Sequence, residues 1–169
     1  MKKLVLVSGP AGIGKSTFCQ RYIAAHPEEN CFIVAADEVR KAMCGDYDKF
    51  PPNHDMSLVY SEMIRLMKEA AAKNEDLVMM VDTTMLFDER RLFFVKSLPE
   101  YDFKQLILLK LHDYSICVKQ NAARIGSKKV PEDVVVDMIA HYYDPSPETL
   151  TFFDDYKVVY LDDEKTSLF

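Results

Sequence analysis

The stretch "GPAGIGKST", residues 9–17, follows the apolar run at residues 4–7, with only Ser8 between them. Its first eight residues match the pattern G-x-x-x-x-G-K-[ST], which is typical of a phosphate-binding loop (Walker A motif) between a strand and a helix. Glycines let successive backbone N–H groups turn inward around an anion, and the following helix offers its positive N-terminal end. The stretch therefore predicts a strand, an anion-binding loop and a helix, in that order.

The two residues that end the motif indicate the ligand. Lys15 supplies a cation for β- and γ-phosphates, and the Ser16 hydroxyl is a ligand for Mg²⁺. The predicted cofactors are therefore ATP, or another NTP, and Mg²⁺. The residues expected to contact them are Gly9, Ala11, Gly12, Ile13, Gly14, Lys15, Ser16 and Thr17.

A dinucleotide-binding fold is the first alternative, because Asp37 follows the second apolar run, where that fold keeps its ribose-binding acid. The dinucleotide fingerprint is G-x-G-x-x-G, whereas residues 9–16 have the spacing G-x-x-G-x-G-K-S. Lys15 and Ser16 favour a nucleoside triphosphate with a metal ion.

Length and composition predict one soluble domain over residues 1–169. Apolar residues make up 49% and charged residues 28%, which is ordinary for a globular chain. A net charge of −6 argues against a broad basic surface that coats nucleic acid, although it leaves room for a local basic groove.

Two further features predict a cytoplasmic protein without membrane contact. The four cysteines form no C-x-x-C pair, so we expect reduced and mostly buried thiols. The apolar run near the start is too short for a signal peptide, and no later run approaches the roughly 20 residues of a membrane span.

Short apolar runs alternate with longer segments of helical period, a pattern that predicts βαβ units and a parallel sheet. Because each run is almost continuously apolar, helices should cover both faces of a five-stranded sheet. This is the three-layer α/β fold of P-loop NTPases and kinases. The predicted strands are residues 3–8, 31–35, 77–82, 103–111 and 157–161.

Capping and breaking residues bound the predicted helices. Asp37 and Asp88 are good N-caps, while Pro27 and Gly45 end the helices before them. The stretches "CGDYDKFPPNHD" (44–55) and "YDPSPE" (143–148) are expected to be loops. The predicted helices are residues 14–26, 37–44, 53–73, 88–96, 112–124 and 131–143.

Ligands of such sheets bind at the carboxyl ends of the strands, where Asp37 and Arg40 follow the second strand. They stand one helical turn apart, so they point the same way. The carboxylate is suited to take the proton of an acceptor hydroxyl, and the arginine to hold an anionic substrate. An N-cap with a helical ion pair would leave the same pattern.

Two more segments complete the candidate site. "LVMMVDTT" (77–84) has the form of a Walker B strand, so Asp82 is expected to support the metal, or to position substrate together with Thr83. "AARIGSKKVPEDV" (122–134) carries Arg124, Lys128 and Lys129, and a basic lid over residues 124–131 would place a cation on the transferred phosphate. The structural alternatives are that Asp82 caps the end of its strand and that residues 124–131 form a solvated loop.

In this order, "GPAGIGKST", "DEVR", "VDTT…DERR" and "NAAR…KKVPEDV" resemble the kinase module of 5′-polynucleotide kinases and the wider group of small P-loop kinases. The resemblance implies that Asp37 is the general base and that Arg40 contacts a substrate phosphate. It also implies that Asp82 supports the acceptor site or the metal and that Arg124 is the lid arginine. Thr84 stands where an asparagine is common in that group.

The sequence thus predicts an ATP-dependent phosphotransferase with Lys15, Asp37 and Arg124 in catalytic roles. Its expected partners are a nucleotide and a hydroxyl acceptor, either a polynucleotide 5′ end or a small metabolite. A nucleotide-dependent switch or ATPase is the alternative from another class. An extended basic or apolar surface for a partner protein would favour it, and the sequence indicates none.

Overall fold

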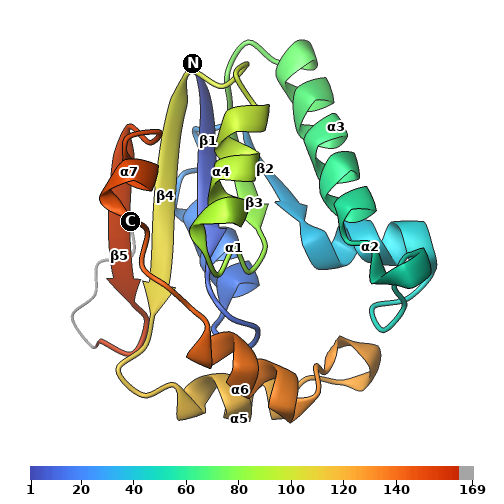
Figure 1. The fold of residues 1–169 in the computed structure, drawn as a ribbon. Helices are drawn as coiled ribbons and strands as arrows, with labels where there is room; N and C mark the ends of the chain where they lie inside the picture. Colours follow the sequence, from blue (N-terminus) through green and yellow to red (C-terminus); the bar gives the residue numbers. More distant parts are fainter. Residues whose placement is uncertain (164–169) are drawn as a thin grey trace.

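The computed structural model describes residues 1–163, so the last six residues of the predicted domain lie outside it. Its sheet has five parallel strands in the order β2-β3-β1-β4-β5 (Figure 1). The predicted fold class is confirmed, and β2 and β3 have the predicted bounds. The strands are β1 (Lys2–Ser8), β2 (Cys31–Ala35), β3 (Leu77–Asp82), β4 (Phe103–Lys110) and β5 (Asp155–Tyr160).

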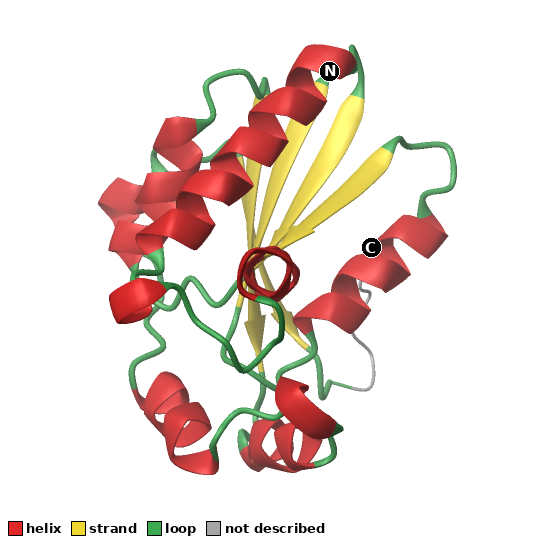
Figure 2. Ribbon diagram, turned by 90° about the vertical axis from the view of Figure 1, so that its right-hand side faces the viewer, coloured by secondary structure: helices red, strands yellow, loops and turns green. Residues whose placement is uncertain are grey.

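Helices lie on both faces of this sheet, as Figure 2 shows from the side. Two 3₁₀ turns, η1 (Pro52–His54) and η2 (Gly126–Lys128), lie in connections between them. The helices are α1 (Lys15–Ala25), α2 (Ala36–Cys44), α3 (Ser57–Lys73), α4 (Asp88–Ser97), α5 (Ser115–Ala122), α6 (Glu132–Ala140) and α7 (Pro147–Leu150).

The central strand β1 divides the core into two layers. Leu4 and Leu6 are fully buried in a cluster with the inner faces of α3 and α4. Val5 and Val7 are fully buried on the other side, in a cluster with α1, α5 and α6. Successive side chains of a strand point to opposite faces, so an uninterrupted apolar run is what a strand covered on both sides requires.

Burial is less complete at the edges of the sheet. Every residue of β3 is buried, whereas Ile33 of the edge strand β2 is 37% exposed. All four cysteines are free thiols, as expected; Cys19 and Cys117 are buried, while Cys31 and Cys44 are only partly so.

Two predicted N-caps are wrong. Ala35 caps α2 and Phe87 caps α4, and neither helix end receives a side-chain cap. Asp37 and Asp88 instead lie in the first turns, where their charge still favours the positive end of the helix dipole. The helix α2 follows β2 without a loop, which brings Asp37 to the end of the sheet.

Several predicted helices are shorter than expected. α3 begins at Ser57 because Asn53 and His54 have φ values of 59° and 52°, outside the helical region. α5 begins at Ser115 and α6 ends at Ala140.

The segment predicted as a loop at residues 143–148 contains the start of α7. Ser146 is its N-cap, and its hydroxyl accepts a hydrogen bond from Thr149 N at 3.2 Å. Pro147 occupies the first helical position, where its missing N–H costs nothing.

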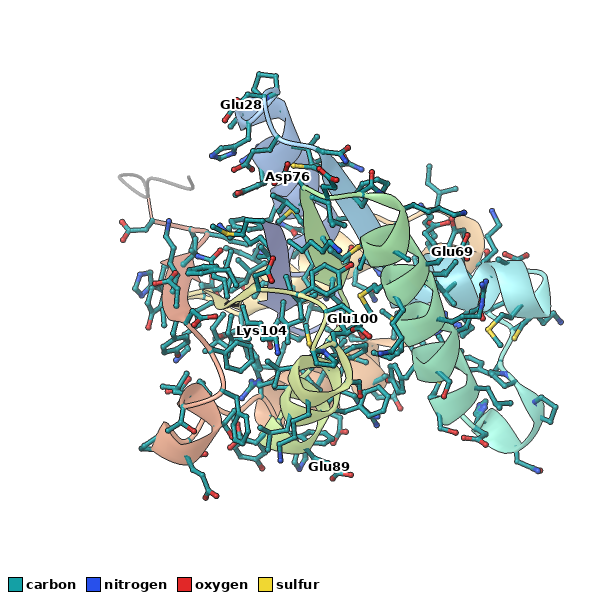
Figure 3. The ribbon with its side chains drawn as sticks, turned by 90° about the horizontal axis from the view of Figure 1, so that it is seen from above. Glu28, Glu69, Asp76, Glu89, Glu100 and Lys104 are labelled. Atoms are coloured by element: carbon teal, nitrogen blue, oxygen red, sulfur yellow. The ribbon has the colours of Figure 1, made fainter. Side chains whose placement is uncertain are left out.

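The two ends of the sheet differ in what they carry. Figure 3 looks onto the amino-terminal ends of the strands, where Asp76, Glu100 and Lys104 lie. Surface ion pairs occur there, such as Lys68 with Glu100 at 2.5 Å, and pairs of this kind contribute little to stability. The opposite, carboxyl-terminal end carries the predicted functional segments. No helix within residues 1–163 is long and apolar enough to cross a membrane.

Candidate active site

The loop between β1 and α1 is fastened to the segment that follows β3. Gly9 N donates to Thr84 O at 3.0 Å, and Ser8 Oγ donates to Met85 O at 2.8 Å. Thr84 thus holds the loop through its backbone. The two strand ends that carry the predicted phosphate and metal ligands are thereby joined directly.

Gly12 has a φ of 82° and lies against α5. A Cβ at this position would be 2.4 Å from the backbone oxygen of Cys117, and that oxygen cannot rotate away as a side chain would. Only a glycine satisfies both the backbone angle and the close approach.

We expect Gly12→Ala to lower the free energy of unfolding by roughly 3 kcal/mol or more, because it adds a backbone clash to the cost of a left-handed residue. Gly45→Ala is the matched control, since Gly45 also has a positive φ, 105°, but a Cβ there meets nothing within 4 Å. Urea denaturation of both variants measures the difference. An equal loss of unfolding free energy in Gly12→Ala and Gly45→Ala would show that the contact of Gly12 with α5 is loose.

The amino-terminal end of α1 is prepared for an anion. Its N-cap is Gly14, which has no side chain to accept the free backbone N–H groups of the first turn. The first intrahelical bond runs from Phe18 N to Gly14 O at 2.9 Å. The N–H groups before it, together with the helix dipole, are the groups that the motif predicts to bind an anion.

Lys15 lies inside the loop that precedes it. Its Nζ donates to Gly9 O at 2.9 Å and to Pro10 O at 3.1 Å. Burial lowers the pKa of Lys15, the negative charges of Asp82 and Asp37 oppose this shift, and the charge of Arg124 adds to it. The structure thus brings Asp82, Asp37 and Arg124, from three separate segments, within electrostatic reach of one ammonium group.

Ser16 and Asp82 form the pair predicted to hold a metal. Ser16 Oγ donates to Asp82 Oδ2 at 2.7 Å, and Asp82 is only 7% exposed. Residues 1–163 contain no cluster of three or more His, Cys, Asp or Glu suited to a metal. A hydroxyl and one carboxylate fit Mg²⁺, which is held by few protein oxygens and completes its shell with water and phosphate.

Arg40 projects from α2 and is held on several sides. Its Nη1 lies 3.6 Å from Asp37 Oδ1, its Nη2 donates to Tyr47 O, and its guanidinium carbon lies 4.4 Å from the centre of the Phe50 ring. Its Nε is buried and has no hydrogen-bond partner within residues 1–163. Asp37 is 63% exposed, so this carboxylate is accessible.

The predicted lid, residues 124–131, connects α5 to α6. Arg124 is half-buried, and its Nη1 donates to Lys128 O at 3.3 Å. Asn121 clamps the far end of the lid: its Nδ2 donates to Val130 O at 2.6 Å and its Oδ1 accepts from Val130 N at 3.0 Å. Hydrogen bonds at both ends of the predicted lid therefore fix its shape, and Lys129 is exposed on it.

The other predicted site residues differ in exposure. Ala11 and Ile13 are buried beneath the loop, so only their backbones remain for a ligand. Thr17 is exposed on the first turn of α1. Thr83 is 6% exposed directly after Asp82, which makes it an inward-facing neighbour of the pair. The roles assigned to all these residues stay predictions.

Two positioning residues were missed. Arg91 is fully buried in α4; its Nε donates to Met85 O at 3.0 Å and its Nη2 to Tyr143 O at 2.6 Å. Burial lowers the pKa of Arg91, and the pair with Asp88 at 3.3 Å opposes the shift. Tyr142 Oη donates to the backbone oxygen of Ser8 at 3.0 Å. Both brace the segments that carry the phosphate loop.

The only hint of Arg91 in the sequence is its spacing. It stands three residues after Asp88 in the stretch "DERR", as an i,i+3 ion pair requires. Nothing in that spacing indicates that the charged group is buried.

Comparisons with known proteins agree with this architecture. The sequence matches the AAA domain family over residues 4–145. A search of curated proteins finds no match. Three solved structures share the fold at 14–15% identity, which supports an inference of fold alone.

The first of these structures is a gluconokinase from Sinorhizobium meliloti 1021, with 15% identity, a TM-score of 0.60, and coverage of 96% of this chain and 84% of that one. The second is Kti12 from Chaetomium thermophilum in complex with ADP-AlF3, with 14% identity, a TM-score of 0.65, and coverage of 96% and 91%. The third is a fungal RNA kinase, with 15% identity, a TM-score of 0.66, and coverage of 99% of this chain but 40% of that one.

Proposed function

The chain belongs to the AAA domain family, and we propose that it is an ATP-dependent phosphotransferase that moves the γ-phosphate of ATP to an acceptor hydroxyl. Family membership and the loop geometry support nucleotide binding. The transfer step rests on the residues beside the loop.

The observation that carries the proposal is that Asp37, an accessible carboxylate within electrostatic reach of Lys15, pairs with the incompletely bonded guanidinium of Arg40. Asp37 acts electrostatically on Lys15, and Arg40 keeps a buried Nε without a partner within residues 1–163. A buried donor left unpaired costs about 1–3 kcal/mol, and because this atom is buried, the Arg40 side chain has to shift before an acceptor atom of a bound substrate can pair with it.

The proposed mechanism assigns one task to each group. Lys15 and the N–H groups of α1 bind the β- and γ-phosphates, and Ser16 and Asp82 would hold Mg²⁺, which when bound neutralises phosphate charge. Asp37 takes the proton of the acceptor hydroxyl as the acceptor oxygen bonds to the γ-phosphorus in line, while the bond from that phosphorus to the oxygen bridging it to the β-phosphate breaks and ADP leaves. Arg124 stabilises the charge on the transferred group. Positioning and charge supply most of the rate, since such a transfer needs little covalent help.

Two acceptor classes are proposed. A polynucleotide 5′-hydroxyl comes first, because the order of the motifs resembles 5′-polynucleotide kinases and the fold is shared with an RNA kinase. A small metabolite is the second, because the fold is also shared with a gluconokinase, of which this chain covers 84%.

The test is a transfer screen with γ-labelled ATP and Mg²⁺. The acceptors are 5′-hydroxyl DNA, 5′-hydroxyl RNA, nucleosides, sugars and amino-alcohols, and the readout is which of them becomes labelled. A labelled acceptor supports the proposal and identifies the class. Label appearing only as free phosphate across the whole panel would instead indicate an ATPase.

We expect Arg40→Ala to raise the KM for the acceptor about 10- to 100-fold with little change in kcat, because a fixed anion clamp binds ground state and transition state alike. Steady-state kinetics with the labelled acceptor measure both constants. Arg65→Ala is the control, since Arg65 pairs with Glu62 and Glu69 on the exposed side of α3. An unchanged acceptor KM would remove Arg40 from the site.

A further inference from the structure

The lid touches the loop that follows α2, and we name residues 45–51 the α2 loop. Ser127 Oγ of the lid donates to Asp46 Oδ1 of the α2 loop at 2.6 Å. The two segments are 81 residues apart in sequence. They approach each other at the carboxyl-terminal end of the sheet, where η2 faces the end of α2 (Figure 1). This contact bridges the donor side and the acceptor side of the site.

On the acceptor side, the contact continues through Tyr47 to Arg40. Asp46 Oδ1 also accepts from Tyr47 N at 2.7 Å, which fixes the backbone of Tyr47. Tyr47 O accepts from Arg40 Nη2, and Tyr47 Oη donates to Glu38 Oε1 at 2.6 Å. The position of Arg40 therefore depends on the α2 loop.

On the donor side, the contact continues through η2 to Arg124. Ser127 lies in the middle of this 3₁₀ turn, and Lys128 O accepts from Arg124 Nη1 at 3.3 Å. Lys128 Nζ also lies 4.9 Å from the centre of the Tyr47 ring, a cation–π contact between the same two segments. The position of Arg124 therefore depends on the turn that Ser127 attaches to Asp46.

We infer that the Ser127–Asp46 hydrogen bond is a latch that sets Arg124 and Arg40 in register with each other, and that Ser127 and Asp46 are positioning residues for the transfer reaction. The inference about transfer rests on the proposed function. The latch itself is a property of the fold. The carboxylate of Asp46 is ionised at neutral pH. Hydrogen bonds to ionised groups are shorter and stronger than those between neutral groups.

The first experiment measures the latch without any substrate. Hydrogen exchange of the amides in residues 125–129 and 46–48 is compared between the wild type, Ser127→Ala and Asp46→Ala. Ser127→Ala loses the latch bond, whereas Asp46→Ala also loses the bond from Tyr47 N. We therefore expect about tenfold faster exchange in both segments from Ser127→Ala, at least as much from Asp46→Ala, and no further increase in the double variant over Asp46→Ala. Ser127→Thr keeps the hydroxyl and should restore slow exchange.

Asp48→Ala is the matched control, since Asp48 is an exposed acid of the same loop. It should leave exchange within twofold of the wild type. Unchanged exchange in Ser127→Ala and Asp46→Ala would overturn the latch. An equal increase in Asp48→Ala would also overturn it, because loss of charge in the loop would then be the cause.

The second experiment measures transfer with the acceptor identified by the screen. Ser127→Ala and Asp46→Ala should lower kcat about tenfold, raise the acceptor KM, and leave the Kd of a fluorescent ATP analogue, measured without acceptor, within twofold. Faster exchange with unchanged kcat and acceptor KM would overturn the positioning role. If the wild type transfers phosphate to no acceptor, the proposed function fails while the exchange result still decides the latch.

Discussion

Replacing Lys15 with alanine is expected to abolish useful nucleotide binding and to raise the Kd for ATP by more than about a hundredfold, since it removes a charged donor from the centre of the loop. The ammonium group donates to Gly9 O and Pro10 O, which leaves one of its three N–H groups for a phosphate. Isothermal titration with ATP or a non-hydrolysable analogue and Mg²⁺ measures the loss.

The fold should tolerate this substitution. Burial disfavours the charged form of Lys15, as its lowered pKa indicates, so the native state loses little when the charge is removed. Thermal unfolding of Lys15→Ala without nucleotide should match the wild type within a few degrees, and Lys15→Met repeats the test with a side chain of similar length. ATP affinity within fivefold of the wild type would contradict the assignment of the loop as the phosphate site.

Asp37→Ala is expected to behave differently, with kcat falling about 10²- to 10⁴-fold while ATP affinity is kept. Its carboxylate is 63% exposed, and the one ion pair it forms within residues 1–163, with Arg40, spans 3.6 Å, so the structure gives it little share in stability. Single-turnover transfer and nucleotide titration on the same preparation separate the two effects. Asp37→Asn keeps the shape and should be nearly as inactive.

Asp133→Asn is the control for Asp37, because Asp133 is also an exposed acid in the first turn of a helix, α6. It should retain the wild-type rate. Near-normal turnover of Asp37→Ala with a true acceptor would show that another group takes the proton.

The sheet could be predicted well from the sequence because its strands are apolar on both faces. Both β2 and β3 have the predicted bounds, because each is a short and nearly continuous apolar run, although only β3 is buried along its whole length. The resemblance to small P-loop kinases is confirmed at the level of family and fold. Helix ends were less predictable, because the positive φ values of Asn53 and His54 depend on how the chain enters α3.

The residues of the site also differ in how well the sequence predicts them. The phosphate loop is a local structure, defined by glycines and a lysine within one short stretch, so its position could be predicted without knowledge of the fold. Arg91 and the pair of Ser127 with Asp46 depend on contacts between distant segments, 52 residues apart for Arg91 with Tyr143 and 81 for the latch. No spacing pattern in the sequence records such contacts.

The position of α2 at the margin of the sheet has a consequence for how the specificity of such a protein changes. Within residues 1–163, β2 pairs with β3 alone, whereas β1 is flanked on both sides. In the proposed function, the loop after the central strand β1 binds ATP, and the helix after the edge strand β2 binds the acceptor. Substitutions at this edge of the sheet would change the acceptor specificity while ATP binding stays the same.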